Sequence, residues 1–335
     1  MSRPASFDRR PESGRRSFLG GLCAAGVAGI AAAPRSVAAA DYPTRPIALI
    51  SPFSPGGPND IVGRTIAEPL AGMLGQPIVV ETVTGAGGLV GTRRLLSAPA
   101  DGYTLLIGAA YLVTAPHLYK SANFDPGRDL IPLSPPVESL LVYVSGSHGD
   151  LKAMIDNARR SGTPIRVAHP GAGTLSHLGS ELLRLESQAP MVMVPYRGVG
   201  PAITDLMGGH ADLLIDGISS SLPQIRAGRL KALCVPDAAR NPLLPDVPTT
   251  AELGFPSVRV RAWNAIFARA GTPADVVDRL STEISRIVRQ PAVSESLKQR
   301  GLEPGAESPA AFRERLATES AHWQAVVRKA GITVE

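Results

Sequence analysis

The chain has 335 residues, of which 44% are hydrophobic and 19% charged, a balance typical of globular proteins. This length is enough for two domains. The formal net charge is +5, but residues 1–40 hold six arginines and two acids, so the rest has 28 basic and 27 acidic residues. A nearly neutral body gives no electrostatic support for a nucleic-acid partner.

The first 40 residues have the three parts of an export signal in order. Arg15-Arg16-Ser17-Phe18-Leu19 is a twin-arginine pattern, the apolar run 20–33 follows it, and Ala38-Ala39-Ala40 has the small residues of a cleavage site. The run is too short and too rich in Ala and Gly for a stable membrane span, although an uncleaved anchor is the alternative. We therefore expect residues 1–40 to be a twin-arginine signal peptide and the mature protein to be periplasmic.

Strands and helices alternate after this segment. Ile47–Ile50 is predicted to be a buried strand, and apolar residues at helical spacing over 61–74 predict a helix that Pro69 should kink or shorten. A strand at 78–80, a helix at 89–97 and a strand at 103–107 follow. This order predicts a mainly parallel sheet covered by helices.

The middle of the chain repeats the pattern, and the end is mostly helical. Strands are predicted at 141–144, 165–168, 192–194, 213–215 and 230–235, with helices at 175–186, 201–207 and 222–226. Pro273 is predicted to open a helix with an apolar stripe from Val276 to Ile287, and 309–330 is predicted to form another. We expect this last part to pack back onto the first α/β unit.

Three glycine-rich loops each follow a predicted strand and precede a predicted helix. They are Ser54–Asp60, Thr84–Gly88 and Pro170–His177. Glycine lets the backbone approach a ligand closely, and a helix N-terminus offers unpaired N–H groups to an anion. Because ligands bind beyond the carboxyl ends of strands in open α/β sheets, the loops predict an anion site. A helix-capping role for Asn59, Asp60, Thr174 and Ser176 is the alternative.

Catalytic and cofactor motifs have little support. The segment 85–91 resembles a dinucleotide fingerprint, but its third glycine is displaced, and no P-loop lysine or G-x-S-x-G elbow is present. The six histidines show no metal-binding spacing, so we expect neither a metal nor a cofactor. Cys234 is the only cysteine after residue 40, which excludes an internal disulfide, and its apolar surroundings favour a buried structural role. His177 is predicted either to contact ligand or to orient its loop, and Asp216 ends an apolar strand facing a cleft or a turn.

Several further segments resemble one known family, the Bug-type receptors, which are the periplasmic substrate-binding proteins of tripartite tricarboxylate transporters. The resemblance runs from Tyr42 to the C-terminus and rests on the following segments: 42–47 (YPTRPI), 52–60 (PFSPGGPND), 85–88 (GAGG), 99–106 (PADGYTLL), 173–178 (GTLSHL), 194–198 (VPYRG) and 245–252 (PDVPTTAE). It implies that a carboxylate is held between two lobes by loop backbone and small polar side chains. The sequence departs from the family pattern at Thr82-Val83, Ala115-Pro116 and Ser54, all near the expected pocket, so it does not predict which carboxylate is bound.

Together, the pattern and the resemblance predict a two-lobed α/β periplasmic binding protein with a hinge of two chain crossings. The expected first lobe comprises residues 41–144 and 236–335, and the second comprises 145–235. We expect a monomer without enzymatic activity that captures a small carboxylate for a membrane transporter. A sensor acting on a membrane kinase, and an exported hydrolase or lyase using His177 and Asp216, are the alternatives. The expected ligand-binding residues are Phe53, Pro55, Gly56, Gly57, Asn59, Asp60, Gly85, Ala86, Gly173, Thr174, Ser176, His177 and Asp216.

Overall fold

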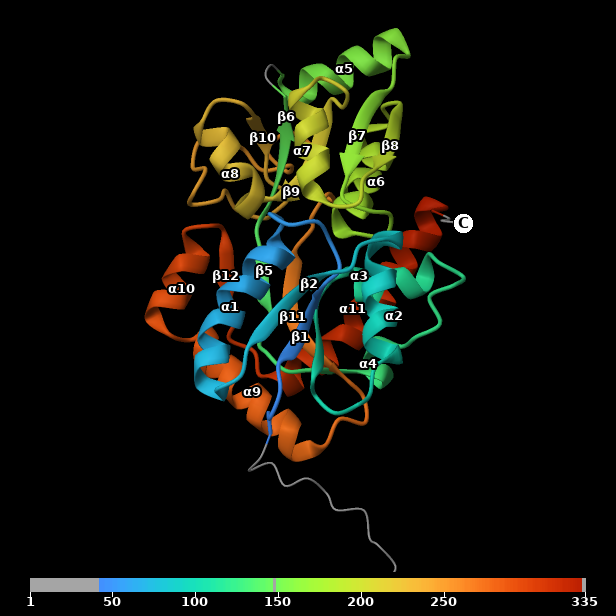
Figure 1. The fold of residues 1–335 in the computed structure, drawn as a ribbon. Coiled ribbons are helices and arrows are strands. Elements are labelled where there is room, and N and C mark those ends of the chain that lie inside the picture. The colour runs from blue at the N-terminus through green and yellow to red at the C-terminus, as the bar shows by residue number, and fades with distance from the viewer. Residues whose placement is uncertain (1–41, 147–148, 333–335) are drawn as a thin grey trace, which may run out of the picture. The chain divides into compact units, whose positions relative to one another are not determined.

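The computed structural model describes residues 42–146 and 149–332, so the predicted signal peptide lies outside the described residues. Twelve strands in this part of the chain form two sheets (Figure 1). One sheet has seven strands and the other has five, and helices pack against both. No helix in the described ranges is long and apolar enough to cross a membrane.

The seven-stranded sheet has the order β12-β5-β11-β3-β1-β2, with β4 paired to β11. Its strands are β1 (Ile47–Ser51), β2 (Ile78–Thr82), β3 (Thr104–Ala109), β4 (Leu130–Pro132), β5 (Val137–Ser139), β11 (Ala262–Arg269) and β12 (Leu302–Pro304). The β1, β2 and β3 strands pair in parallel, whereas β11 is antiparallel to β3, β4 and β5. The prediction of a mainly parallel sheet is therefore wrong for this half, because the chain returns from the second sheet and adds β11 in the opposite direction.

Two helical layers cover this sheet, as the alternation of side chains along its strands requires. Leu105 and Ile107 of β3 pack in a core with α1 (Pro58–Leu74), α9 (Ala274–Val288) and α10 (Pro291–Lys298). Leu106 belongs to the other core, with residues of α2 (Leu89–Ser97), α3 (Tyr111–Thr114) and α11 (Pro309–Ala330). Short turns of helix, α4 (Pro126–Asp129) and the 3-10 segments η2 (Ala86–Gly88) and η3 (Ala115–His117), complete this half.

The five-stranded sheet has the order β10-β6-β9-β7-β8. Its strands are β6 (Leu141–Ser145), β7 (Ile165–His169), β8 (Met191–Pro195), β9 (Leu213–Gly217) and β10 (Lys231–Cys234). The helices that pack on it are α5 (Leu151–Ser161), α6 (Leu175–Ser187), α7 (Val199–Met207) and α8 (Ile218–Arg226). The β7, β8 and β9 strands are parallel neighbours, and β6 and β10 add antiparallel strands.

The chain passes between the sheets twice. It leaves the seven-stranded sheet after Ser139 of β5, enters the five-stranded sheet at Leu141 of β6, and returns between Cys234 of β10 and Ala262 of β11. The first crossing therefore lies a few residues before the predicted position near Val144, because β6 pairs with β9 and β10. The second crossing comprises residues 235–261, a segment that includes Pro236.

Of two other sequence predictions, one differs from the structure and one agrees with it. Helix α1 continues through Pro69 to Leu74, so of the two predicted effects of Pro69, a kink or a shorter helix, the shorter helix is wrong. Cys234 is fully buried, as expected for a structural thiol.

Candidate functional site

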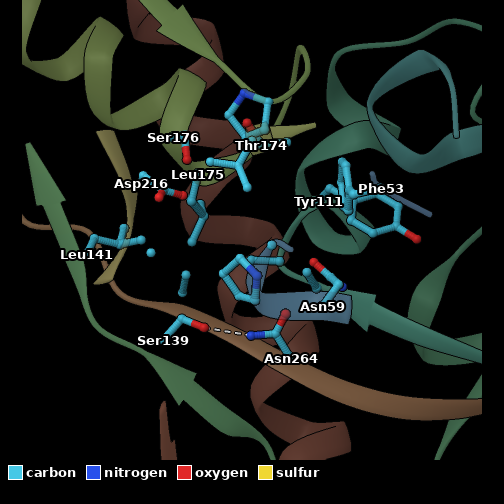
Figure 2. Close-up of a pocket in the computed structure, with 18 of the residues that line it drawn as sticks. Phe53, Asn59, Tyr111, Ser139, Leu141, Thr174, Leu175, Ser176, Asp216 and Asn264 are labelled. Atoms are coloured by element: carbon cyan, nitrogen blue, oxygen red, sulfur yellow. Dashed lines mark hydrogen bonds between the residues drawn. The ribbon is translucent and has the colours of Figure 1, made fainter. Parts of the chain in front are cut away.

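The strand ends of both sheets border one cavity (Figure 2). Its volume, including space open to solvent, is about 610 Å³. The cavity is lined by Phe53, Gly57, Pro58, Asn59, Ala109, Ala110, Tyr111, Ser139, Leu141, Pro170, Thr174, Leu175, Ser176, Val199, Asp216, Gly217, Ala262, Trp263 and Asn264. Six predicted site residues are among them: Phe53, Gly57, Asn59, Thr174, Ser176 and Asp216.

The start of α1 forms one wall. The backbone at Gly57 caps this helix without a side-chain hydrogen bond, and Pro58 occupies its first turn, where no N–H is needed. Asn59 is only 7% exposed, and its amide Nδ2 donates to the carbonyl of Ile107 at 3.1 Å. This bond fixes the side chain and leaves Oδ1 without a partner among the described residues. Unpaired backbone N–H groups at the helix start also favour a negatively charged group here.

Asp60, a predicted ligand-binding residue, does not line the cavity and makes its contacts near its own loop. Its Oδ2 accepts the N–H of Gly56 at 3.0 Å, and its Oδ1 pairs with Arg64 at 2.8 Å. Gly56 has φ of 86°, a left-handed conformation that favours glycine. Pro55, Gly56 and Asp60 do not line the cavity, and their contacts hold the loop that carries Phe53 and Gly57.

The start of α6 forms the facing wall. Thr174 caps this helix: its Oγ1 accepts from the N–H of His177 at 3.3 Å and donates to the carbonyl of Gly171 at 2.7 Å. Ser176 lies in the first turn, and its hydroxyl has no partner among the described residues. The free hydroxyl and the first backbone N–H groups of α6 therefore provide hydrogen-bond donors at the cavity.

His177 lies behind this loop and does not line the cavity. Its Nδ1 accepts the N–H of Gly173 at 3.2 Å, and its ring stacks on His169 at 4.5 Å between centroids. Burial lowers the pKa of His177, and burial next to that ring lowers the pKa of His169 to about 3. Both imidazoles are therefore neutral at pH 7, and the geometry matches the loop-orienting role. Gly173 also lies outside the cavity lining.

Asp216 is the one carboxylate in the cavity wall within the described residues. It lies near the end of β9, is 2% exposed, and its Oδ2 accepts the hydroxyls of Ser220 at 2.5 Å and Ser221 at 2.6 Å. Burial raises its pKa to about 6, while these hydroxyls and the N–H of Gly217 act in the opposite direction. A buried acid of this kind is typical of a functional position.

In the second glycine loop, the predicted binding residues Gly85 and Ala86 do not line the cavity. A Cβ on Gly87 would lie 2.2 Å from the carbonyl oxygen of Ala172, so this loop packs against the 170–177 loop. A Cβ on Gly88 would lie 2.7 Å from the ring of Tyr111, which is a cavity residue. The loop therefore supports the cavity from outside.

Sequence reasoning missed the wall contributed by β11. Asn264 is 2% exposed, and its Nδ2 donates to the Oγ of Ser139 at 2.6 Å, next to the first chain crossing (Figure 2). Trp263 also lines the cavity, and its indole N–H donates to Glu319 at 2.7 Å. A single Asn inside the apolar run 262–268 was the signal that could have marked this strand as a site element.

Three hydroxyls connect the two halves around the cavity. Ser54 Oγ donates to the carbonyl of Arg197 at 3.0 Å, and Tyr119 Oη donates to the carbonyl of Ala172 at 3.0 Å. Thr114 Oγ1 donates to the carbonyl of Gly173. Each donor is a side chain from the part bearing the seven-stranded sheet, and each acceptor is a main-chain carbonyl from the other part.

Two sheets joined by two crossings, with a cavity lined by strand-end loops of both, define the class of periplasmic binding proteins. The solved structure of the periplasmic binding protein BugD is similar, with a TM-score of 0.83 and 33% identity over 88% of this chain and all of that one. MatC of Rhodopseudomonas palustris, solved with bound malate, has a TM-score of 0.81 and 32% identity over 85% of this chain and all of that one. An R. palustris protein solved with adipate has a TM-score of 0.83 and 31% identity over 88% of this chain and 99% of that one.

Sequence comparison gives the family. The model of the tripartite tricarboxylate transporter family receptor matches residues 62–332. Protein BugT of Bordetella pertussis is 37% identical over 309 residues, which cover 91% of this chain and 94% of that protein. The chain belongs to the tripartite tricarboxylate transporter receptor family and is a solute-binding protein. The family resemblance and the two-lobed α/β fold class expected from sequence are thereby confirmed.

Proposed function

We propose that the protein binds a small carboxylate in the cavity between the two sheets and presents it to a membrane transporter. The observation that carries this proposal is that the starts of α1 and α6 both border the same cavity. Their unpaired N–H groups and positive helix ends suit one carboxylate. The malate and adipate in the similar solved proteins support this choice of ligand class.

In this proposal, Gly57, Asn59, Thr174 and Ser176 surround the carboxylate, Phe53 packs on the rest of the ligand, and Asp216 faces a polar group. Pro55, Gly56, Asp60, Gly85, Ala86, Gly173 and His177 act indirectly, through the shape of the three loops. Backbone donors dominate because the cavity lining has no Lys, Arg or His in the described residues.

The two α/β parts are proposed to be lobes that open and close about the crossings at 140 and 235–261. Ligand then shifts the population toward the closed form, which the membrane partner recognises. Export by the twin-arginine signal of residues 1–40 and action as a monomer without catalysis complete the proposal. A sensor role would use the same closed form with a membrane kinase.

A hydrolase or lyase built on His177 and Asp216 has no support from the geometry. No hydrogen bond joins the two side chains within 42–146 and 149–332, and His177 contacts Gly173, Glu181 and His169 instead. In the same ranges, no group of three His, Cys, Asp or Glu residues is arranged to hold a metal ion.

The proposal is tested by calorimetric titration of the purified protein with a panel of small carboxylates, together with native mass spectrometry of any ligand that co-purifies. Ser176→Asp places a negative charge at the start of α6 and should weaken carboxylate binding at least roughly tenfold. Ser121→Asp adds the same charge at an exposed loop position and is the matched control. Equal losses in both variants, or no binding of any carboxylate by the unmodified protein, would contradict the proposal.

A further inference from the structure

The charges in the cavity wall do not balance if the ligand is a carboxylate alone. Asp216 is an acid at the cavity, and no cationic side chain accompanies it among the described lining residues. Two carboxylates in one enclosed space repel each other strongly, because the surrounding dielectric is low. A ligand that carries only negative charge is therefore poorly matched to this wall.

The neutral polar groups of the cavity also favour a ligand that donates hydrogen bonds. Asn59 and Asn264 each use the amide N–H₂ on a protein acceptor, so their Oδ1 atoms are the groups left for a ligand. The Oδ2 of Asp216 already accepts two hydroxyls, whereas its Oδ1 accepts from no side chain in the described residues. All three side chains are at least nine-tenths buried and line the cavity, so a ligand there can reach these acceptors.

The position of Asp216 shows where in the cavity a hydrogen-bond donor of the ligand would bind. Strands β7 and β9 are parallel neighbours, with Val167 opposite Leu213 and Ala168 opposite Leu214. Their carboxyl ends therefore emerge at the same edge of the sheet, and α6 begins after β7 while Asp216 lies near the end of β9. A group bound by Asp216 must consequently be close to a carboxylate bound at the start of α6.

We propose that the ligand is an amino-carboxylate whose cationic nitrogen is bound by Asp216, adjacent to the carboxylate held at the start of α6. This inference rests on the proposed carboxylate-binding function and narrows it. The zwitterion leaves the cavity with balanced charge, and the ammonium group supplies N–H donors to the acceptor oxygens in the cavity wall. The remaining walls, including Phe53, Leu141 and Trp263, suit a compact, largely apolar remainder of the ligand.

The test is calorimetric titration of the ligand-free protein with acids of matched carbon skeleton. One series is 2-aminobutyrate, 2-hydroxybutyrate and butyrate; the other is glutamate, 2-hydroxyglutarate and glutarate. Within at least one series, the amino acid should bind roughly tenfold more tightly than the hydroxy acid, and more tightly still than the unsubstituted acid. Asp216→Asn should abolish this preference by weakening only the amino acid. Asp205→Asn, which changes a carboxylate of α7 outside the cavity, should preserve it.

Each outcome separates this inference from the broader function. If unsubstituted acids bind as tightly as amino acids, carboxylate binding stands and the amino-carboxylate inference is overturned. Binding of butyrate that strengthens as pH falls would overturn it too, because Asp216 would then act as a protonated donor to the carboxylate. Amino-acid preference that survives in Asp216→Asn overturns the role of this residue. If no acid of either series binds, both this inference and the proposed use of the cavity fail.

Discussion

Replacing Asp216 with Asn should stabilise the ligand-free protein at neutral and alkaline pH. The pKa of this carboxyl is raised from 3.8 to about 6 by burial, so its ionised form is disfavoured in the fold. Each pKa unit corresponds to 1.36 kcal/mol, so ionised Asp216 lowers stability by about 3 kcal/mol. Asn offers one acceptor oxygen in place of two, and the lost acceptor costs about 1 kcal/mol. The net gain is therefore about 2 kcal/mol.

The stability difference between Asp216→Asn and the unmodified protein should depend on pH. Because the pKa in the folded state lies above the unfolded value, the protonated acid is favoured by folding. That contribution is complete below pH 3.8 and is lost as pH rises through about 6. The advantage of Asp216→Asn over the unmodified protein should thus be small near pH 4 and complete at pH 8.

Urea unfolding at pH 4.5 and pH 8, with ligand removed, measures the effect directly, and thermal scans should show a rise in Tm of about 4 °C at pH 8. Ser221→Ala is the matched second variant. It removes a hydroxyl donor to Asp216, so it should destabilise the protein more at pH 8 than at pH 4.5. The reasoning from burial is refuted if Asp216→Asn is less stable than the unmodified protein at pH 8. It is also refuted if the stabilities of the two variants, relative to the unmodified protein, shift in the same direction between pH 4.5 and pH 8.

Three further predictions concern the loops and the core. Burial lowers the pKa of His169 to about 3 and also lowers the pKa of His177, so neither imidazole should titrate near pH 6.5 by NMR. The neutral rings contribute to folding stability above pH 6.5, and this contribution is lost as pH falls below that value. Gly87→Ala should lower the free energy of unfolding in urea by about 1–3 kcal/mol, because the φ of Gly87 is 62° and the new Cβ meets a main-chain carbonyl. Its control, Gly72→Ala in α1, places the Cβ in open space and should raise the free energy of unfolding by about 0.5–1 kcal/mol. The buried Cys234 thiol, whose pKa is raised by burial, should react with a thiol reagent only at the rate of unfolding.

Local patterns in the sequence were sufficient to predict the parallel strands and the loops that follow them. The apolar runs at 47–50 and 213–215 are bounded by turn residues, so their period and length identify strands without tertiary information. The 262–269 segment was not identified, because a run of apolar residues in a region rich in helices does not distinguish a buried strand from a helix. Its place in the centre of the seven-stranded sheet depends on pairing with β3, a contact more than 150 residues away in sequence.

Part of the candidate site was predictable from local sequence, where a glycine-rich loop precedes a helix. Gly57, Asn59, Thr174 and Ser176 lie within three residues after a glycine, at the cap or first turn of a helix, so their position can be predicted from local sequence. Whether a given loop residue faces the cavity or supports its neighbour depends on side-chain contacts that the sequence does not specify, as Asp60 and His177 illustrate. Asn264 and Trp263 enter the site through tertiary packing alone, which no local pattern encodes.

The hydroxyl contacts between the two halves bear on how ligand preference can change over evolution. All three acceptors are main-chain carbonyls, at Ala172, Gly173 and Arg197, which every amino acid possesses. Side chains on the five-stranded half can therefore be exchanged without removing an acceptor. Substitutions on the five-stranded side of the cavity can thus change ligand preference during evolution while the three hydrogen bonds between the halves are kept.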